Sequence, residues 1–379
     1  WLAQAVAKKP APTPLHAEYI SASRQAATNR QRRLLAGVSV ALVVSIALAI
    51  LSLLLFGEAN TQRGIADSIC VCAQMVMGER EITQLYEQKR PHRVHPNFIP
   101  VITLNSASGI VAMAYGAKGP NLTISTACSS SAHALGQAMH AIRAGTADAV
   151  IVVGADASIT PLVFAGFCSL RALSTKYNDA PEKASRPFDL GRDGFVMGEG
   201  AGALILESAT HAKKRKARIY AEVAGYAATS EAHHMVIPRE DGEEVATTMR
   251  LALKDAGVTP AQVDYINAHA TSTTVGDAVE VKAIRLVFKS RADKLAVNAT
   301  KSLVGHTLGA AGSLAGVVSA LTLTSGQIHP TLNLDDPDPA CALAGLSKDP
   351  QTRKAKVALI NAFGFGSNNA AVVLQAVSS

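Results

Sequence analysis

The sequence predicts a layered α/β fold, in which helices cover both faces of a sheet. From about Ile65 onward, apolar runs typical of strands alternate with segments whose apolar residues recur every three or four positions. The chain is rich in Ala, Gly and Val, and only 4% of its residues are aromatic, which fits closely packed helices and strands. With 379 residues, it is long enough for one large or two medium domains.

The elements follow from these patterns in chain order. The predicted strands are Ala149–Val153, Ala203–Leu206, Val263–Ile266, Lys294–Val297, Val357–Ile360 and Ala370–Leu374. The predicted helices are Ser130–Ala144, Gly242–Ala256, Asp277–Phe288 and Gly309–Ser325.

Residues 1–64 differ in character from the rest of the chain. Leu34–Phe56 is a run of 23 residues without a charge, long enough to cross a bilayer as a helix. Arg30, Arg32 and Arg33 precede it and would place its N-terminal side in the cytoplasm. We therefore expect a transmembrane helix over residues 34–56; a secretory signal peptide and a buried core helix are the alternatives.

Charge and cysteine content exclude some functions. The net charge is +7, but residues 1–64 hold seven Lys or Arg and two Glu, so +5 of it lies in that segment. The globular part is nearly neutral, which gives no support to nucleic-acid binding. The five cysteines follow no metal-ligand or disulfide spacing, and their odd number indicates a reducing compartment.

The run STACSSSAHALGQAMHAIRAG contains the strongest candidate for chemistry, Cys128. The strand-like stretch NLTIST ends at this cysteine, and a helix begins directly after it. A thiol at the first turn of a helix faces unpaired N–H groups and the positive end of the helix dipole, which both favour thiolate over thiol. We therefore expect a nucleophile; a small buried core cysteine is the alternative.

Two later motifs carry histidines. His269 lies in NAHATSTTVGDAVE, at the end of the strand VDYI, where α/β proteins place reactive groups, and Gly276-Asp277 is expected to cap the next helix. Lys301 and His306 lie in NATKSLVGHTLGAAGSLAG, in a loop after another strand. A structural hydrogen-bonding histidine and an ordinary loop are the respective alternatives.

A fourth motif, NAFGFGSNNAAVVLQ from Asn361, predicts a glycine-rich turn between two C-terminal strands. Glycines there allow positive φ and close approach of the backbone to a ligand, although a simple hairpin turn would also need them.

Together with the block from Cys168 to Glu207, these motifs resemble the β-ketoacyl-acyl-carrier-protein synthases, most closely the elongating type II condensing enzymes. The resemblance runs from about Pro91 to the C-terminus. It implies a thiolase-like five-layer α-β-α-β-α sandwich of two similar halves, normally in a homodimer. Residues 65–210 would form the N-terminal half with Cys128, and residues 211–379 the C-terminal half with both histidines.

The resemblance also implies roles. Cys128 would take an acyl chain from acyl carrier protein, and malonyl thioester would then lose CO2 to give an enolate that attacks the acyl-cysteine. His269 and His306 would donate to the thioester oxygen, and Lys301 would organise the site with Glu280. No cofactor is implied beyond the phosphopantetheine of the carrier. The resemblance implies further that the N–H groups of Cys128 and Phe365 form an oxyanion hole. Thr271 and Thr273 would bind the pantetheine arm. Phe365 would act as a gate, and Phe195 would line the acyl pocket.

Before Pro91 the chain departs from the family, whose members open with a hydrophobic strand and a glycine turn. The first half is therefore expected to be incomplete, with unpaired strand edges in the middle of its sheet and an exposed apolar face. A span at residues 34–56 would also place the enzyme outside the cytoplasm, away from carrier-bound thioesters. Either the span does not insert this way or residues 1–64 are joined to an unrelated enzyme fragment; we favour the second. A ketosynthase for a specialised polyketide and an inactive membrane-tethered fragment are the functional alternatives.

Overall fold

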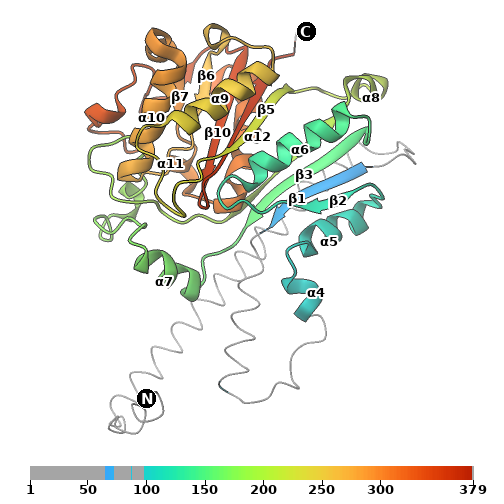
Figure 1. The fold of residues 1–379 in the computed structure, drawn as a ribbon, viewed down its shortest axis with the longest axis horizontal. Coiled ribbons are helices and arrows are strands. Elements are labelled where there is room, and N and C mark those ends of the chain that lie inside the picture. The colour runs from blue at the N-terminus through green and yellow to red at the C-terminus, as the bar shows by residue number, and fades with distance from the viewer. Residues whose placement is uncertain (1–64, 72–86, 88–97, 378–379) are drawn as a thin grey trace. The chain divides into compact units, whose positions relative to one another are not determined.

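The computed structural model describes residues 65–71, 87 and 98–377 (Figure 1). A first sheet has the strand order β2-β1-β3-β4, in which β1, β2 and β3 run parallel and β4 is antiparallel to β3. Its strands are β1 (Ile65–Val71), β2 (Asn121–Thr123), β3 (Ala149–Asp156) and β4 (Gly200–Glu207).

A second sheet has the order β5-β11-β10-β6-β7. The strands β10, β6 and β7 are parallel, whereas β11 is antiparallel to both of its neighbours. The strands are β5 (Glu222–Ser230), β6 (Tyr265–Asn267), β7 (Ala296–Asn298), β10 (Val357–Gly364) and β11 (Asn368–Gln375). A short ribbon joins β8 (Gln327–Ile328) to β9 (Gln351–Thr352).

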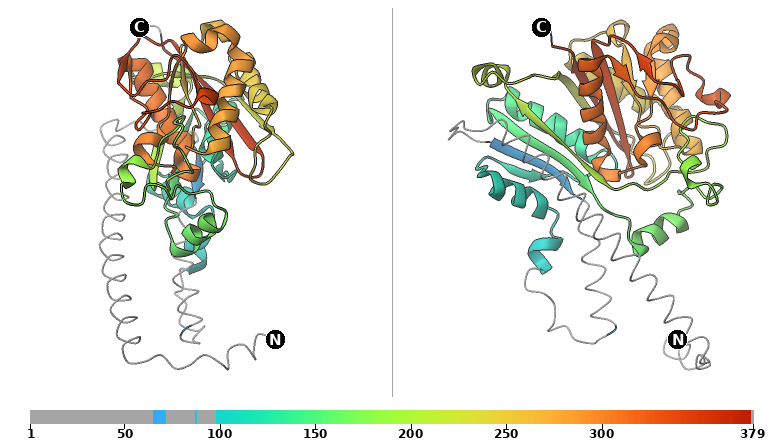
Figure 2. Two further views of the ribbon diagram at one scale, coloured as in Figure 1. Left: turned by 90° about the vertical axis from the view of Figure 1, so that its left-hand side faces the viewer. Right: turned by 180° about the vertical axis from the view of Figure 1, so that it is seen from behind.

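The helices complete five layers (Figures 1 and 2). Helix α5 (Ser106–Tyr115) packs on β1 and β2, on the outer side of the first sheet. Helices α6 (Ser130–Arg143) and α12 (Ala311–Ser325) contact strands of both sheets and fill the middle layer. Helices α9 (Glu243–Asp255) and α10 (Thr274–Phe288) cover the second sheet from outside. This arrangement is the expected five-layer α-β-α-β-α sandwich.

Shorter helices lie in the connections between these layers. They are α4 (Phe98–Ile102), α7 (Pro161–Ser169), α8 (Ala209–Lys214) and α11 (Lys301–Val304). The expected boundary between the halves, at residues 210 and 211, falls inside α8.

Two buried clusters hold the layers together. Leu135 and Met139 of α6 pack with Val152 of the first sheet and Ile360 of the second, between the sheets. The other cluster joins α9 and α10 to the outer face of the second sheet, for example through Met249. Because α6 and α12 are buried on both sides, small residues dominate where they meet.

The six predicted strands and four predicted helices are all present, with ends that differ by a few residues. The largest difference at a helix is in α10, which begins at Thr274 rather than Asp277 because the Thr273 hydroxyl caps it by accepting from Gly276 N–H at 3.2 Å. Strands β1, β5, β8 and β9 and helices α4, α5, α7, α8 and α11 were not predicted, and Lys301, which was expected in a loop, is the first residue of α11 (Lys301–Val304).

The expectation of an unpaired edge in the first sheet is wrong at β3. Strand β1 pairs along the whole of its length with β3, from Ile65 opposite Ala149 to Val71 opposite Ala155, and its other edge pairs with β2. The segment IADSICV therefore occupies the central position that was expected to be empty.

The predicted membrane helix over residues 34–56, like all of residues 1–64, lies outside the described residues. Among the residues that the structure describes, Leu308–Ser325 alone has the length and apolar composition of a span, and 56% of it is buried. This segment contains α12, the helix that lies between the two sheets.

Candidate active site

Cys128 lies in a tight turn directly before α6. The preceding residue, Ala127, has a φ of +51°, a left-handed backbone conformation that residues other than glycine rarely adopt. Hydroxyls at the start of the helix hold the turn: Ser129 Oγ donates to Thr126 O at 2.8 Å and Ser130 Oγ donates to Ala127 O at 2.6 Å. The sulfur is thus presented at a fixed place between the sheets.

The electrostatic surroundings of Cys128 differ from the sequence-based expectation. The residue is 7% exposed, and burial raises the pKa of its thiol to about 11. The charge of Lys301 and the N–H groups of Phe365 and Cys128 itself lower this pKa, while the carboxylate of Asp156 raises it. We expected the start of the helix to favour the thiolate. This expectation is wrong, because burial raises the pKa of the thiol by more than the N–H donors and the charge of Lys301 lower it.

His306 lies against the sulfur, with Nε2 at 3.0 Å from Cys128 Sγ. Its Nδ1 accepts the N–H of Leu308 at 3.3 Å, so the proton of the neutral ring belongs on Nε2, which donates to the sulfur. The backbone of His306 is fixed by bonds to Val196 O at 2.7 Å and from Gly198 N at 3.0 Å. Burial, followed by the charge of Lys301, holds the pKa of this imidazole well below its usual value.

His269 meets His306 edge to face, with ring centroids 5.6 Å apart. Its Nδ1 accepts the N–H of Phe363 at 3.3 Å, which again leaves the ring proton on Nε2. Burial is the main cause of a pKa well below the usual histidine value, and the charges of Lys301 and His306 add to it. Both rings are therefore neutral N–H donors at physiological pH.

Lys301 lies beside these rings at the start of α11. Its Nζ donates to His269 O at 2.5 Å and lies 3.5 Å from His269 Nδ1. Burial lowers the pKa of Lys301 to about 8, against the opposing effect of Glu280. Glu280 itself accepts the N–H groups of His269 and Ala270, each at 2.8 Å, and the amide of Asn361 at 2.8 Å. Its carboxylate thus fixes the backbone that carries His269.

Thr271 and Thr273 follow His269 in the same turn. Their hydroxyls are 3.0 Å apart, and both side chains are half-buried. Thr273 is also the N-cap of α10, where its hydroxyl accepts the N–H of Gly276. The buried Asp277 accepts the N–H groups of Ser272 at 3.1 Å and Phe188 at 3.0 Å, and fixes this turn against the preceding loop.

Three phenylalanine rings contact one another in a row that begins at His306. Phe195 is 4% exposed and packs edge-on against His306, with centroids 5.3 Å apart. Phe167 of α7 lies between Phe195, at 5.1 Å, and Phe365, at 6.5 Å. Phe195 and Phe365 were expected at the site from the sequence, whereas Phe167, which contacts both, was not.

The glycine turn joins β10 to β11, as expected, and approaches the cysteine closely. A Cβ on Gly364 would lie 2.4 Å from Thr126 O and 3.2 Å from Cys128 N. Only glycine permits this contact, which brings the N–H of Phe365 to the sulfur.

The structure thus brings Cys128, His269, His306, Lys301, Glu280, Phe195 and Phe365 into one region, with Thr271 and Thr273 on the adjoining turn. Sequence reasoning missed Asn361, Phe363 and Phe167, whose contacts cross between elements. Asn361 and Phe363 stand in the motif NAFGFGS, and their positions in β10 were the available signal. Among the residues that the structure describes, no group of three or more His, Cys, Asp or Glu side chains is placed to hold a metal ion.

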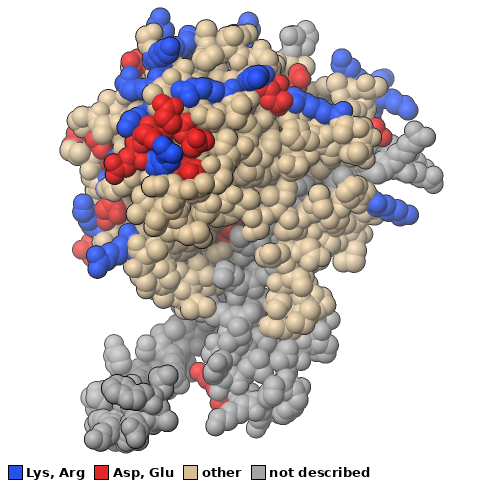
Figure 3. All heavy atoms as spheres, viewed as in Figure 1, with Lys and Arg blue, Asp and Glu red and all other residues tan. Residues whose placement is uncertain are grey.

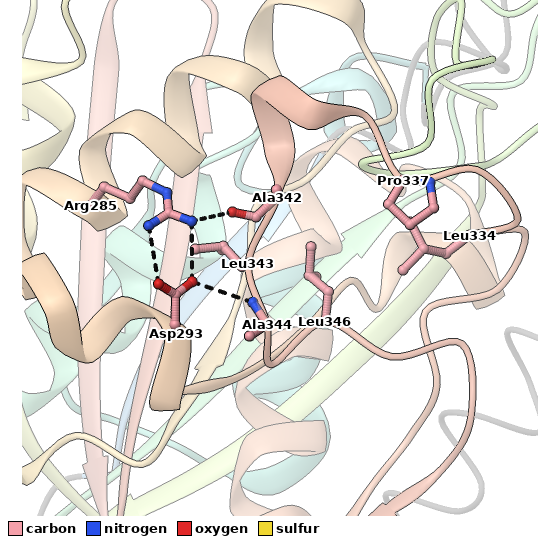
Figure 4. Close-up of a pocket in the computed structure, with 8 residues that line it drawn as sticks. All are labelled: Arg285, Asp293, Leu334, Pro337, Ala342, Leu343, Ala344 and Leu346. Atoms are coloured by element: carbon pink, nitrogen blue, oxygen red, sulfur yellow. Dashed lines mark hydrogen bonds and ion pairs between the residues drawn. The ribbon is translucent and has the colours of Figure 1, made fainter.

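A separate cavity of about 370 Å³ lies between α10 and the segment 334–346 (Figure 4). None of the residues above lines it. Its polar groups bond to one another: Arg285 Nη2 donates to Asp293 Oδ1 at 3.1 Å and to Ala342 O at 2.5 Å. The cavity is therefore not part of the cysteine–histidine site.

Known proteins share both the sequence and the fold. The family models "Beta-ketoacyl synthase, N-terminal domain" and "Beta-ketoacyl synthase, C-terminal domain" match residues 12–212 and 220–335. The 3-oxoacyl-[acyl-carrier-protein] synthase 2 of Coxiella burnetii is 47% identical over 287 residues, 76% of this chain and 69% of that protein. The mitochondrial 3-oxoacyl-[acyl-carrier-protein] synthase of Arabidopsis thaliana is 46% identical over 303 residues, 78% of this chain and 65% of that protein.

A solved structure of a type II polyketide ketosynthase, bound to a hexaketide and in complex with its acyl-carrier protein, superposes with a TM-score of 0.82. It is 35% identical, and the match covers 84% of this chain and 79% of that one. The motifs, the five layers and these similarities agree: the chain belongs to the β-ketoacyl synthase family.

Proposed function

We propose that the chain is a β-ketoacyl-ACP synthase, which condenses an acyl thioester with malonyl-ACP in fatty-acid chain elongation. The observation that carries the proposal is the position of Cys128 Sγ, 3.0 Å from His306 Nε2 and close to a second neutral imidazole, His269. The names of the relatives, 3-oxoacyl-[acyl-carrier-protein] synthases, support the same reaction class, an acyltransferase that forms a carbon–carbon bond.

In the first half-reaction, Cys128 attacks the carbonyl carbon of an acyl-carrier thioester. The sulfur–carbon bond to the carrier breaks, and the cysteine proton ends on the departing pantetheine sulfur. A persistent thiolate is therefore not needed, in keeping with the pKa of about 11. The N–H groups of Cys128 and Phe365 face the sulfur and would hold the oxyanion of the tetrahedral intermediate.

In the second half-reaction, malonyl thioester loses CO2, and the electron pair of the broken bond forms an enolate. Its oxygen accepts from the Nε2–H groups of His269 and His306, which are neutral because burial and Lys301 disfavour their protonation. The enolate carbon then attacks the acyl-cysteine carbonyl, and the released Cys128 sulfur regains a proton from solvent.

The remaining residues would position these groups. Lys301 and Glu280 hold the backbone of His269, so we assign Glu280 a positioning role rather than contact with substrate. Thr271 and Thr273 would bond the pantetheine arm. Phe195 would line the acyl pocket, and Phe365 would gate it. The carrier phosphopantetheine supplies the thioesters, and the proposed reaction uses no other cofactor.

The direct test uses acyl carrier protein loaded with a radiolabelled acyl chain. We expect label on the wild-type chain and on Cys168→Ala, which removes an exposed cysteine, but none on Cys128→Ala. Label that persists on Cys128→Ala, or folded wild-type protein that takes none, would reject the proposal in favour of an inactive fragment.

The solved ketosynthase complex supports acyl carrier protein as the partner of this chain. Because that ketosynthase is bound to a hexaketide, a polyketide substrate is the alternative to a fatty acyl chain. Transfer of saturated acyl chains but not of β-keto chains would identify fatty-acid elongation. The opposite preference would identify a polyketide enzyme.

We further propose that the chain forms a homodimer through α4, α5 and the edge strand β2. Helices α4 and α5 contain no charged residue, and Figure 3 shows a largely uncharged surface where they lie. Ile110 and Leu122 are each 57% exposed and Met113 is 77% exposed. Among the described residues β2 is an edge strand, and an edge strand beside such a surface favours pairing with a second copy. Sedimentation should show a dimer that Met113→Lys dissociates and that Met235→Lys, in the loop after β5, does not.

For the N-terminal segment we propose that residues 34–56 associate with a membrane without crossing it in the orientation considered above, so that the enzyme, with halves 65–210 and 211–379, works in the cytoplasm. The uncharged run supports the first part, and the use of carrier-bound substrates supports the second. Flotation with liposomes tests the attachment: we expect the full chain to float and a chain that begins at residue 58 to remain in the dense fraction.

A further inference from the structure

Asp156 is the last residue of β3 and is 2% exposed. Its Oδ2 accepts the N–H of Gly309 at 3.0 Å, and its Oδ1 accepts the hydroxyl of Ser158. A buried carboxylate needs hydrogen-bond donors to hold it. One donor of Asp156 is the N–H of Gly309, three residues after His306.

The turn that Asp156 contacts is the one that sets the ring of His306. Leu308 has a φ of +44°, and its N–H donates to His306 Nδ1 at 3.3 Å. A leucine keeps this left-handed conformation only where its surroundings impose it. The bond from Gly309 to Asp156 fixes the next peptide unit, so the carboxylate holds the amide that selects the Nε2–H form of the ring.

The end of β3 packs closely against the start of α12, which follows the Leu308–Gly309 turn, so the two segments hold a fixed relative position. Ser313 Oγ at the start of α12 donates to Gly154 O at 3.3 Å, and a Cβ on Gly154 would lie 2.4 Å from that hydroxyl oxygen. Asp156, two residues further along β3, therefore meets Gly309 at a set distance.

The charge of Asp156 also acts on the nucleophile. It raises the pKa of Cys128, whereas the charge of Lys301 lowers it. Two opposite charges thus act on the sulfur from different halves of the fold.

We propose that Asp156 is a positioning residue of this active site: its carboxylate accepts the N–H of Gly309 and so fixes the Leu308–Gly309 turn that orients His306. The decarboxylation test of this role rests on the proposed function. The alkylation test does not, because it reports the pKa of Cys128, which the charge of the same carboxylate raises.

Alkylation of Cys128 by iodoacetamide, followed by mass spectrometry as a function of pH, tests the charge. In Asp156→Asn we expect the profile to move to lower pH by about one unit, so that alkylation below the midpoint is about tenfold faster than in wild type. Asp264→Asn is the control: the carboxylate of Asp264 likewise accepts backbone N–H groups, from Lys356 and Val357, and its removal should leave the profile unchanged. Asp156→Glu separates the charge from a structural defect, since it also disturbs the turn but keeps the charge: faster alkylation in Asp156→Asn alone is an effect of the charge.

Release of CO2 from malonyl-ACP tests the anchor. We expect Asp156→Asn to lose roughly tenfold, less than the 10²–10³ typical of removing a stabilising donor outright. Asp156→Glu keeps the charge and displaces the carboxylate, so its alkylation profile should match wild type while its decarboxylation falls. This variant decides the positioning role even if Asp156→Asn does not fold.

An unchanged alkylation profile in folded Asp156→Asn would count against a charged carboxylate held in this place. A wild-type decarboxylation rate in Asp156→Glu would overturn the positioning part. If wild-type protein releases no CO2 at all, the proposed reaction fails, while the alkylation result still decides the role of the charge.

Discussion

His306 Nε2 lies 3.0 Å from Cys128 Sγ, although 178 residues separate them in the chain. The cysteine comes from the turn before α6, next to the first sheet, and the histidine from the loop after α11, beyond the second sheet's β7. Each turn contains a residue with positive φ, Ala127 or Leu308. The contact therefore depends on the packing of α6 against α12, the middle layer of the fold.

Lys301→Met tests whether the lysine keeps the imidazoles neutral. Its charge lowers the pKa of both His269 and His306, so its removal should raise both values. The acid limb of malonyl-ACP decarboxylation should then move to higher pH, because an Nδ1 that carries a proton can no longer accept the N–H of Leu308 or Phe363, and the ring loses the bond that aims its Nε2–H at the enolate. A pH–rate profile that keeps its acid limb in place would contradict this account.

The same substitution makes a prediction about stability. Lys301 has a pKa of about 8 in the folded chain against an ordinary 10.5, so between these values the unfolded state binds one more proton. The free energy of unfolding of wild type, relative to Lys301→Met, should therefore rise as the pH increases from about 8 to 10.5. Urea unfolding of both proteins at several pH values measures the difference, and a difference that falls or stays flat over this window would be inconsistent with a buried lysine.

Gly364→Ala tests the close approach of the glycine turn to the cysteine. The added Cβ would meet Thr126 O at 2.4 Å, so the two turns must separate. We expect a loss of about 1–3 kcal/mol in stability, seen as a lower Tm, together with slower acylation of Cys128. Gly166→Ala in α7 is the control: its Cβ meets nothing within 4 Å, and we expect a small gain in stability. Equal Tm changes in the two variants would show that the turns are not in contact.

The sequence predicted secondary structure and site residues correctly where the pattern lies within a short segment of the chain. The periodicity from Ser130 to Ala144 predicted α6 almost to the residue, because its buried face repeats at helical spacing. The motifs marked Cys128, His269 and His306 because each sits at an end of an element. Helix α10 was predicted to begin at Asp277, since Asp is a good capping residue, but that carboxylate is turned to Ser272 and Phe188, and Thr273 caps the helix instead.

What the sequence could not show depends on contacts between distant segments. The segment Ile65–Val71 becomes a strand by pairing with β3, some eighty residues later, and its own pattern is mixed. The raised pKa of Cys128 has the same origin: the helix start was visible, but the desolvation arises only when both halves close over the sulfur.

The central claim is that one cysteine and two neutral imidazoles form a single site with divided roles. A single-turnover experiment tests it most directly: load Cys128 with a labelled acyl chain, add malonyl-ACP, and follow the label by mass spectrometry. We predict that wild type releases the label as a 3-oxoacyl thioester with loss of CO2, whereas His269→Ala and His306→Ala acquire the label but retain it, with turnover slower by about 10²–10³. Release at the wild-type rate from either histidine variant would contradict the account.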